Sequence, residues 1–338
     1  MSKHPTMREV AELAGVSLMT VSRVVNGQPG VQPETAARVA RAIRRLGYQR
    51  NDAARQLRRG GKPTQTIGLL VDDLANPFFA AVARAVEDAA RERNCVVLVG
   101  SSNFSLRRER EVVSAFCARQ VDGLIVAPVV GSHRFLRDQM IRGTKVVCID
   151  RPADGMDVDT VLVDNRRAAH DAVRHLLERG HRRIGYLGDR EDIWTIQERY
   201  TGFRAAFADL GLEPDPALLV HGLLDRESAA LATVSLMRAP TPPTALFASK
   251  NLITMGAIDA LNGAGAVALV GFDEFALADK LVPPVTVVAQ DPHAIGATAA
   301  QLLFSRVGGD TSPTREIILR TRLVARGSGE ITATTVPA

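Results

Sequence analysis

The 338-residue sequence predicts an α/β protein in which a short helical unit precedes a larger body built on two parallel sheets. Charge divides the chain in the same way. Residues 1–62 hold twelve Lys/Arg and four Asp/Glu (+8), whereas the other 276 residues hold 30 and 33 (−3), which together give the net charge of +5. Helix start and stop signals recur over residues 6–47, and apolar strand-like runs alternate with helical patterns from residue 66 onward. A basic module on a slightly acidic body is typical of a nucleic-acid-binding protein with a separate sensing or catalytic part.

Three short helices are expected in the N-terminal unit. The segment "TMRE" begins the first helix, because the Thr6 hydroxyl and the Glu9 carboxylate can form a capping box, and Gly15 ends that helix. Ser17 is suited to cap the second helix and Pro33 to the first turn of the third. A tight turn between the first two helices is typical of a helix-turn-helix unit, whose second helix lies in the major groove of DNA.

Leu18 and Met19 stand in the first turn of that second helix, where a solvated helix would carry polar groups. Their apolar surfaces could contact thymine methyl groups, and Arg23 could donate a bidentate pair to guanine. Alternatively, both could be additional core residues. Nearby hydroxyl and amide groups could position the helix through phosphate contacts. The DNA-contacting residues predicted in this unit are Thr6, Ser17, Leu18, Met19, Thr20, Ser22, Arg23 and Asn26.

The body carries two successive series of strand-like runs. The first is "TIGLLV", "CVVLVG", "GLIVA" and "KVVCID", and the second is "RIGYLG", "LLV", "ALFA" and "VALVGF", with helical patterns between the runs. This pattern predicts two doubly wound lobes with a cleft at the carboxyl ends of their strands, where small ligands bind. Signatures of enzymes are missing, since the sequence contains no GxGxxG, P-loop, GxSxG or HExxH, and its seven histidines are scattered. No cofactor and no metal site is predicted.

The whole chain resembles the LacI/GalR family of bacterial transcriptional regulators. The resemblance begins with "TMREVAELAGVSLMTVSRVVNGQPGVQPETAARVARAIRRLGY" and continues, in the family's order, with "IGLLVDDLANPFFAAVARAVEDAA", "VDGLIVAP", "VCIDRP", "LLERGHRRIGYLG" and "ALVGFDEF". It implies a periplasmic-binding-protein-like body in which the chain crosses between the lobes three times, near 161–163, 288–290 and 319–323. The expected domains are a headpiece (1–50), a hinge helix and linker (51–63) and the body (64–338), with lobe 1 over about 64–161 and 290–320 and lobe 2 over about 162–289 and 321–338.

The resemblance also implies that residues 51–63 contain a hinge helix. This segment has too few residues before Gly60 and Gly61 to be a stable helix alone, so it should fold against DNA and a second copy. In the family two such helices meet in the minor groove, where a leucine wedges between base pairs. Leu57 matches that leucine, and Asn51 and Ala54 are expected to contact DNA with it. The alternative is an exposed linker with an incidental leucine.

Polar residues at predicted strand ends are the candidates for binding a small effector. Asp150 and Arg151 follow "VCI", Asp273 follows "ALVGF", and Arg199 opens a helix just after Trp194. Carboxylates and a guanidinium can bind hydroxyl groups in pairs, and an aromatic ring can stack on a sugar. Alternatively, Asp273 could only cap a helix. The resemblance adds three further residues to the predicted effector site, namely Phe78, Phe79 and Asn251, of which the two phenylalanines could equally be plain core.

One departure from the family concerns the ligand class. Lys250-Asn251 stands where the family usually has Asn-Asp, so a cation is added and an acceptor carboxylate is missing. This exchange modestly favours an anionic effector, such as a sugar acid or a sugar phosphate, over a neutral sugar.

These observations together predict a sequence-specific DNA-binding regulator, most simply a repressor, whose operator affinity is controlled by a sugar or sugar derivative. A homodimer on a pseudo-palindromic operator is expected, because one short recognition helix reads too few bases. The chain should act in the cytoplasm, since it has no apolar leader and no membrane-spanning run. Alternatives are a solute-binding protein or a sugar-modifying enzyme with a basic N-terminal extension.

Overall fold

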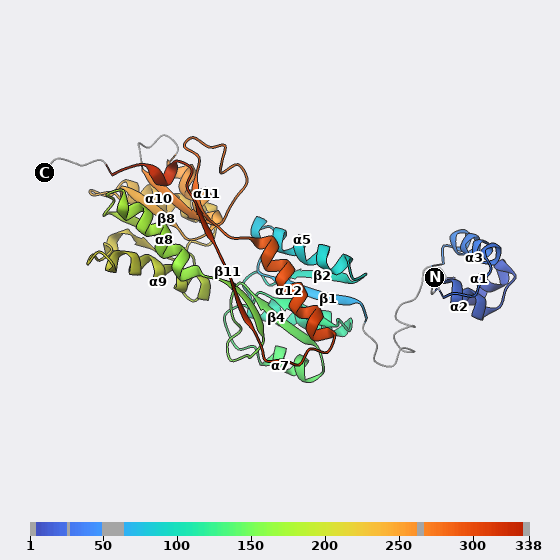
Figure 1. Ribbon diagram of the computed structural model, residues 1–338. Helices are drawn as coiled ribbons and strands as arrows, with labels where there is room; N and C mark the ends of the chain where they lie inside the picture. The colour runs from blue at the N-terminus through green and yellow to red at the C-terminus, as the bar shows by residue number, and fades with distance from the viewer. Residues whose placement is uncertain (1–4, 26–27, 49–63, 262–266, 334–338) are drawn as a thin grey trace. The chain divides into compact units, whose positions relative to one another are not determined.

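The computed structural model describes residues 5–25, 28–48, 64–261 and 267–333, in two compact units that divide between Lys62 and Pro63 (Figure 1). The first unit contains α1 (Met7–Ala14), α2 (Leu18–Val25) and α3 (Pro33–Leu46). Its capping box is confirmed: the Thr6 hydroxyl accepts from the Glu9 N–H (3.4 Å), and the Glu9 carboxylate accepts from the Thr6 N–H (2.6 Å). Gly15 ends α1 in the left-handed region, with φ of 61°. The three helices enclose a small core around Val10, Val21 and Val39.

The second unit is built on two six-stranded sheets, so the predicted α/β fold is confirmed. The first sheet has the order β11-β5-β4-β3-β1-β2 and is parallel throughout. The second has the order β12-β10-β9-β8-β6-β7 and is parallel except for β12, which runs antiparallel to β10. The sequence pattern predicts parallel sheets and does not indicate the reversal of β12.

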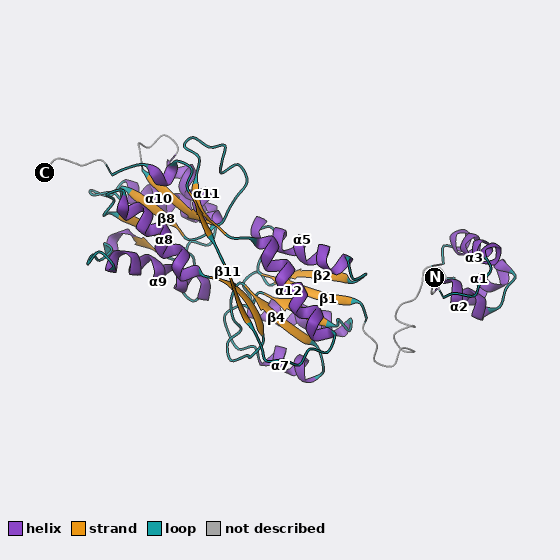
Figure 2. Ribbon diagram, in the orientation of Figure 1, coloured by secondary structure: helices purple, strands orange, loops and turns teal. Residues whose placement is uncertain are grey.

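Lobe 1 contains the first sheet and its helices. Its elements are β1 (Thr66–Val71), α5 (Pro77–Arg91), β2 (Val96–Ser101), α6 (Leu106–Ala118), β3 (Gly123–Val126), α7 (Arg134–Ile141), β4 (Lys145–Ile149), β5 (Asp159–Val163), α12 (Pro292–Val307) and β11 (Glu316–Leu319). Residues alternate along β1: Ile67 and Leu69 pack under α5 and α12, whereas Leu70 packs under α6 and α7. Helices therefore cover both faces of the sheet (Figure 2).

Lobe 2 contains the second sheet. Its elements are α8 (Asn165–Glu178), β6 (Ile184–Leu187), α9 (Trp194–Ala208), a 3-10 helix (Pro216–Leu218), β7 (Leu219–Val220), α10 (Arg226–Met237), β8 (Ala245–Ala248), α11 (Asn251–Leu261), β9 (Ala268–Phe272), β10 (Thr286–Ala289), β12 (Arg322–Val324) and a second 3-10 helix (Ser328–Glu330). The pair α8 and α9 covers one face of the sheet, and the pair α10 and α11 covers the other.

The chain passes between the two sheets at three places. It leaves the first sheet after β5, returns after β10, and passes again between β11 and β12 (Figure 1). The carboxyl ends of β1, β4, β6, β8 and β9 consequently face the space between the lobes, which is where the sequence places most of its polar strand-end residues.

Neighbouring helices approach closely at three glycines. A Cβ atom at Gly202 in α9 would overlap the Arg166 carbonyl oxygen of α8, and one at Gly256 in α11 would overlap the Arg226 carbonyl of α10. Gly296 in α12 would bring a Cβ within 2.6 Å of the Val82 carbonyl of α5. Each of these helix pairs is therefore packed backbone to backbone.

We expect Gly202→Ala to lower the free energy of unfolding by roughly 1–3 kcal/mol, because the added methyl group must push α8 and α9 apart. The measurement is urea denaturation of the full chain. Ala208→Ser, on the exposed end of the same helix, is the control and should stay within about 0.5 kcal/mol of wild type. A Gly202→Ala protein as stable as the control would show that the two helices are not held in contact at this point.

Candidate functional site

The first candidate site is the exposed face of α2. Leu18 and Met19 are 50% and 67% exposed, whereas Val21 on the opposite face is fully buried. The alternative that both residues fill the headpiece core is therefore wrong. The Ser17 hydroxyl accepts from the Thr20 N–H (3.1 Å), so it caps the helix that presents these side chains.

The other predicted DNA contacts divide into two groups. Thr6, Thr20, Ser22 and Arg23 lie in or beside α1 and α2, and Arg23 is exposed. Asn26, Asn51, Ala54 and Leu57 lie outside the described residues, and with them the expected hinge helix.

An arginine of α3 holds the turn between α1 and α2. Arg38 Nη2 donates to the carbonyl oxygens of Ala14 (2.6 Å) and Gly15 (3.2 Å). These carbonyls stand at the C-terminal end of α1, where a cation is favourable. The sequence does not reveal this residue, because nothing local relates position 38 to a turn more than twenty residues earlier.

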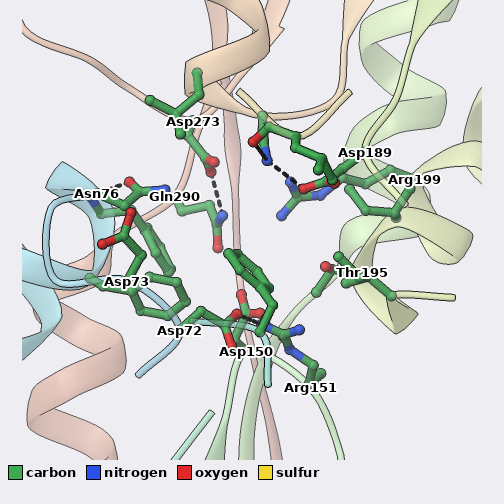
Figure 3. A pocket seen from close by; sticks show the side chains of 18 residues that line it. Asp72, Asp73, Asn76, Asp150, Arg151, Asp189, Thr195, Arg199, Asp273 and Gln290 are labelled. Atoms are coloured by element: carbon green, nitrogen blue, oxygen red, sulfur yellow. Dashed lines mark hydrogen bonds and ion pairs between the residues drawn. The ribbon is translucent and has the colours of Figure 1, made fainter. Parts of the chain in front are cut away.

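The second candidate site is a cavity between the lobes (Figure 3). Its empty space, counted together with the opening to solvent, is about 650 Å³. Lobe 1 contributes the ends of β1 and β4 and the start of α5. Lobe 2 contributes the segments after β6, β8, β9 and β10 and the first turns of α9.

Six of the eight predicted effector residues line this cavity, namely Phe78, Phe79, Asp150, Arg151, Arg199 and Asp273. Phe78 and Phe79 also belong to the lobe 1 core, with ring centroids 5.1 Å apart, so the core and cavity interpretations both hold for them. The cavity is also lined by polar residues that the sequence analysis does not predict, namely Asp72, Asp73, Asn76, Asp189, Thr195 and Gln290. These residues could have been recognised in the sequence by one shared feature, since each lies just after a predicted strand or near the start of a helix.

Trp194 and Asn251, the other two predicted effector residues, are not among the residues that line the cavity. Trp194 is the first residue of α9, and the cavity is lined by Thr195, Ile196 and Arg199 of that helix. Because successive residues turn by about 100°, Trp194 points away from that face. The Asn251 side chain is fully buried at the start of α11. Its Nδ2 atom donates to Asn76 Oδ1 in lobe 1 (2.9 Å).

Arg199 is held in place by uncharged partners. Its Nε donates to Asn165 Oδ1 (2.8 Å), its Nη1 donates to the Ser249 carbonyl (2.6 Å), and its guanidinium carbon lies 3.6 Å from the centre of the Phe272 ring. Arg199 forms no ion pair within the described part of the chain, although its side chain is buried. A fixed and unneutralised guanidinium is well suited to bind the oxygen atoms of a ligand.

Two aspartates take the same unusual backbone conformation at matching places in the lobes. Asp150 follows β4 with φ of 68°, and Asp273 follows β9 with φ of 73°. The N–H of each bonds to the neighbouring strand, Asp150 to the Val161 carbonyl (3.0 Å) and Asp273 to the Val288 carbonyl (2.9 Å). A left-handed residue that is not glycine costs free energy and is enriched at functional sites.

Opposite charges largely compensate one another inside the cavity. Arg151 pairs with Asp72 and with Asp150 (3.1 Å to Oδ2). Burial raises the pKa of Asp72 to about 6, although the Arg151 guanidinium beside it opposes that rise. Burial likewise raises the pKa of Asp273 against the opposing effect of Arg199.

The charge of Lys250 is also neutralised, so this residue does not support the expected preference for an anionic effector. Its ammonium group pairs with Asp189 and donates to the Leu224 carbonyl (3.0 Å), and both side chains of the pair are mostly buried. Five aspartates (Asp72, Asp73, Asp150, Asp189, Asp273) and three cations (Arg151, Arg199, Lys250) line the cavity, a formal charge of −2. The added cation therefore gives no net attraction for an anionic effector.

Family models match both units. Residues 6–51 match bacterial regulatory proteins, lacI family, and residues 173–329 match the periplasmic binding protein-like domain. The HTH-type transcriptional repressor CytR of Escherichia coli (strain K12) is 30% identical over 332 residues, covering 96% of each chain. The HTH-type transcriptional regulator CelR of Thermobifida fusca is 32% identical over 340 residues, covering 97% of this chain and 99% of CelR.

This chain belongs to the lacI family. It is accordingly a DNA-binding transcriptional regulator and not an enzyme. Two solved structures extend the likeness. A CelR–cellobiose complex aligns with a TM-score of 0.68 at 32% identity over 96% of this chain and all of that one. The lac repressor dimer bound to operator and the anti-inducer ONPF aligns with a TM-score of 0.83 over 97% and 99%, and at 24% identity it shows the shared fold.

Among the described residues, no helix is both long and apolar enough to cross a bilayer.

Proposed function

We propose that this lacI-family member is a cytoplasmic repressor whose operator binding is controlled by a neutral, polyhydroxylated small molecule in the cavity between the lobes. The observation that carries the proposal is the cavity itself. It brings a fixed guanidinium, Arg199, to face carboxylates from both lobes, Asp150 and Asp273, with aromatic rings at its wall. A ligand that satisfies both lobes at once stabilises one lobe arrangement over others.

Charge compensation favours a neutral ligand. Carboxylates accept from hydroxyl groups, and the buried Gln290 Oε1 atom, which has no hydrogen-bond partner among the described residues, calls for a donor. Hydroxyl groups supply both donors and acceptors, whereas a carboxylate or phosphate would be repelled by the net acidic wall. The complex of the related CelR with cellobiose supports a sugar or oligosaccharide as the class.

The domain roles follow from this proposal. Residues 1–50 read DNA, residues 51–63 act as a hinge in which Leu57 wedges into the minor groove beside Asn51 and Ala54, and residues 64–338 sense the ligand and associate with a second copy. Lobe 1 comprises the body up to the end of β5 together with α12 and β11, and lobe 2 comprises the remainder of the body, β12 included.

We predict that Leu18 and Met19 determine which DNA sequences are preferred. Leu18→Ser and Met19→Ser should change the ranking of duplexes selected from a random library, because each removes an apolar contact to a base edge, and one mismatched base pair typically costs about 1–3 kcal/mol. Ser22→Ala is the control and should weaken all duplexes by a similar factor. Identical, uniform losses for all three variants would place the reading residues elsewhere.

The ligand class can be tested by removing the carboxylate of Asp189, with which the Lys250 ammonium pairs. Wild type should be stabilised against heat by neutral sugars, cellobiose among them, and not by the matching aldonic acids or sugar phosphates. At 100 times the Kd, a ligand adds about 2.7 kcal/mol to the free energy of unfolding. Asp189→Asn should then admit an aldonic acid, since it leaves the cation unpaired.

Asp192→Asn provides the matched control, because Asp192 is an exposed carboxylate paired with Arg190 outside the cavity. It should leave the ligand preference unchanged. Stabilisation of the wild-type protein by anionic sugars alone would refute the neutral-ligand proposal.

We also propose that two copies associate, since the dimer is what aligns two recognition helices with two half-sites. Each lobe leaves apolar side chains exposed that a second copy could cover: Val96 on the edge strand β2 is 59% exposed, and Leu277 and Val282 in lobe 2 are 68% and 97% exposed. Sedimentation should give twice the 36.3 kDa chain mass, and Val96→Asp with Val282→Asp should lower it. A wild-type monomer bound to a single half-site would contradict this.

A further inference from the structure

The point where the chain enters lobe 1 is tied down by one carboxylate. Asp122, in the loop after α6, accepts from the backbone N–H groups of Thr64 (2.6 Å) and Gln65 (2.8 Å). The Thr64 hydroxyl donates to the Gln120 carbonyl (2.9 Å). The first described residues of the body are thus fixed to the edge of lobe 1 at which its parallel strands begin.

Four exposed cations lie on that same edge: Arg93 after α5, Arg119 after α6, Arg142 after α7, and Lys145 at the start of β4. We call them the edge cations. Backbone contacts place them around the attachment point. Arg119 precedes Gln120, which binds Thr64, and the Lys145 N–H donates to the Asp122 carbonyl (3.4 Å). Arg93 stands in the short turn that leads to Val96, whose N–H donates to the Gln65 carbonyl (2.8 Å).

None of the edge cations forms an ion pair within the parts of the chain that the structure describes. Arg93 and Arg119 each donate one hydrogen bond to a carbonyl of the preceding helix, Arg93 to Ala89 (3.2 Å) and Arg119 to Ala115 (2.8 Å). Completing a helix end is therefore part of their role. Arg93 also lies over the Phe304 ring, 4.8 Å from its centre. A guanidinium has five donors, however, so each of these two side chains keeps donors for a further partner. Acids also lie on this edge: Glu92 and Glu316, at the start of β11, are exposed, whereas Asp122 is occupied by backbone groups.

The edge cations lie on a part of the body whose charge differs in sign from that of the body as a whole. Residues 63–338 carry a net −3, so four unpaired cations at one edge stand against the sign of the whole body. The same edge is joined to the DNA-binding headpiece by residues 49–63, and a chain of that length spans at most about 50 Å. The attachment point on lobe 1 is therefore tethered to a unit that binds DNA.

We infer that the edge cations form a second DNA-contacting surface, on lobe 1, which binds the phosphate backbone and not the bases. This inference rests on DNA binding by the headpiece and is independent of the proposed effector. Phosphate contacts add affinity and salt dependence without adding sequence preference. A ligand that rotates the lobes would also move this surface relative to DNA.

The experiment uses the full-length protein with Arg93→Gln, Arg119→Gln, Arg142→Gln and Lys145→Gln combined. Its matched control removes four exposed cations from lobe 2 by Arg204→Gln, Arg238→Gln, Lys280→Gln and Arg322→Gln, with the same change in net charge. Affinity for a selected duplex and for a scrambled duplex is measured from 50 to 200 mM salt. Circular dichroism and thermal unfolding establish that both variants are folded.

The slope of log K against log salt should become shallower by about 0.9 for each phosphate that is no longer neutralised, and thus by about 2 if half of the edge cations engage DNA. The ratio of selected to scrambled affinity should stay within about threefold of wild type. The control variant should keep the wild-type slope.

An unchanged slope in the edge variant, or an equal change in both variants, overturns the inference and leaves these cations to an acidic protein partner or to helix capping alone. If the wild type shows no preference for any duplex, operator recognition fails, yet the slope on scrambled DNA still tests the edge cations.

Discussion

The three crossings between the lobes are the constraint on which the rest of the body depends, because residues at two of them also hydrogen-bond to charged residues that line the cavity. Asn165, directly beyond β5, accepts from Arg199. Gln290, directly beyond β10, donates to Asp273. A ligand that binds Arg199 and Asp273 therefore acts on side chains fixed by the crossing segments themselves. A change of lobe angle must displace the cavity, and occupation of the cavity must favour one lobe angle. Coupling between such sites is typically 1–3 kcal/mol, or about 5- to 150-fold in affinity.

One further contact spans the cleft away from the crossings. Asn76 caps α5 in lobe 1 with its Oδ1 atom, which accepts from the Phe78 N–H (3.0 Å) and also from Asn251 Nδ2 at the start of α11 in lobe 2 (2.9 Å). The helix start that carries the cavity phenylalanines is thereby linked to the opposite lobe. The Asn251 amide donates this hydrogen bond, whereas an ionised carboxylate at the same position could only accept one. The contact between the lobes in this chain consequently needs no protonation and carries no charge.

The sequence predicts local features well and distant pairings poorly. The capping box of Thr6 and Glu9 spans four residues, and the apolar Leu18 and Met19 stand out within one helix turn, so both can be recognised from neighbouring letters. Strand-end aspartates such as Asp150 and Asp273 are found for the same reason, although their left-handed backbone is not. The sequence does not tell which face of its helix Trp194 occupies, because a shift of one residue at a helix start turns a side chain by about 100°. Arg38 with Gly15, Asn76 with Asn251, and Lys250 with Asp189 lie 23, 175 and 61 residues apart, and no local pattern relates their members.

The Lys250–Asp189 pair illustrates why composition at a site does not determine its ligand. A lysine in place of the family's asparagine adds a positive charge to the sequence, and read alone it favours an anionic effector. In the folded protein the same ammonium group lies against a buried carboxylate, and each charge offsets the cost of burying the other. The charges that stay uncompensated among the lining residues are the Arg199 guanidinium, the carboxylates of Asp73 and Asp273, and part of the charge on the two aspartates that Arg151 shares. The charges left without a protein partner are the ones open to a ligand, so under the proposed function a change to one member of the Lys250–Asp189 pair should alter the ligand preference by exposing the other.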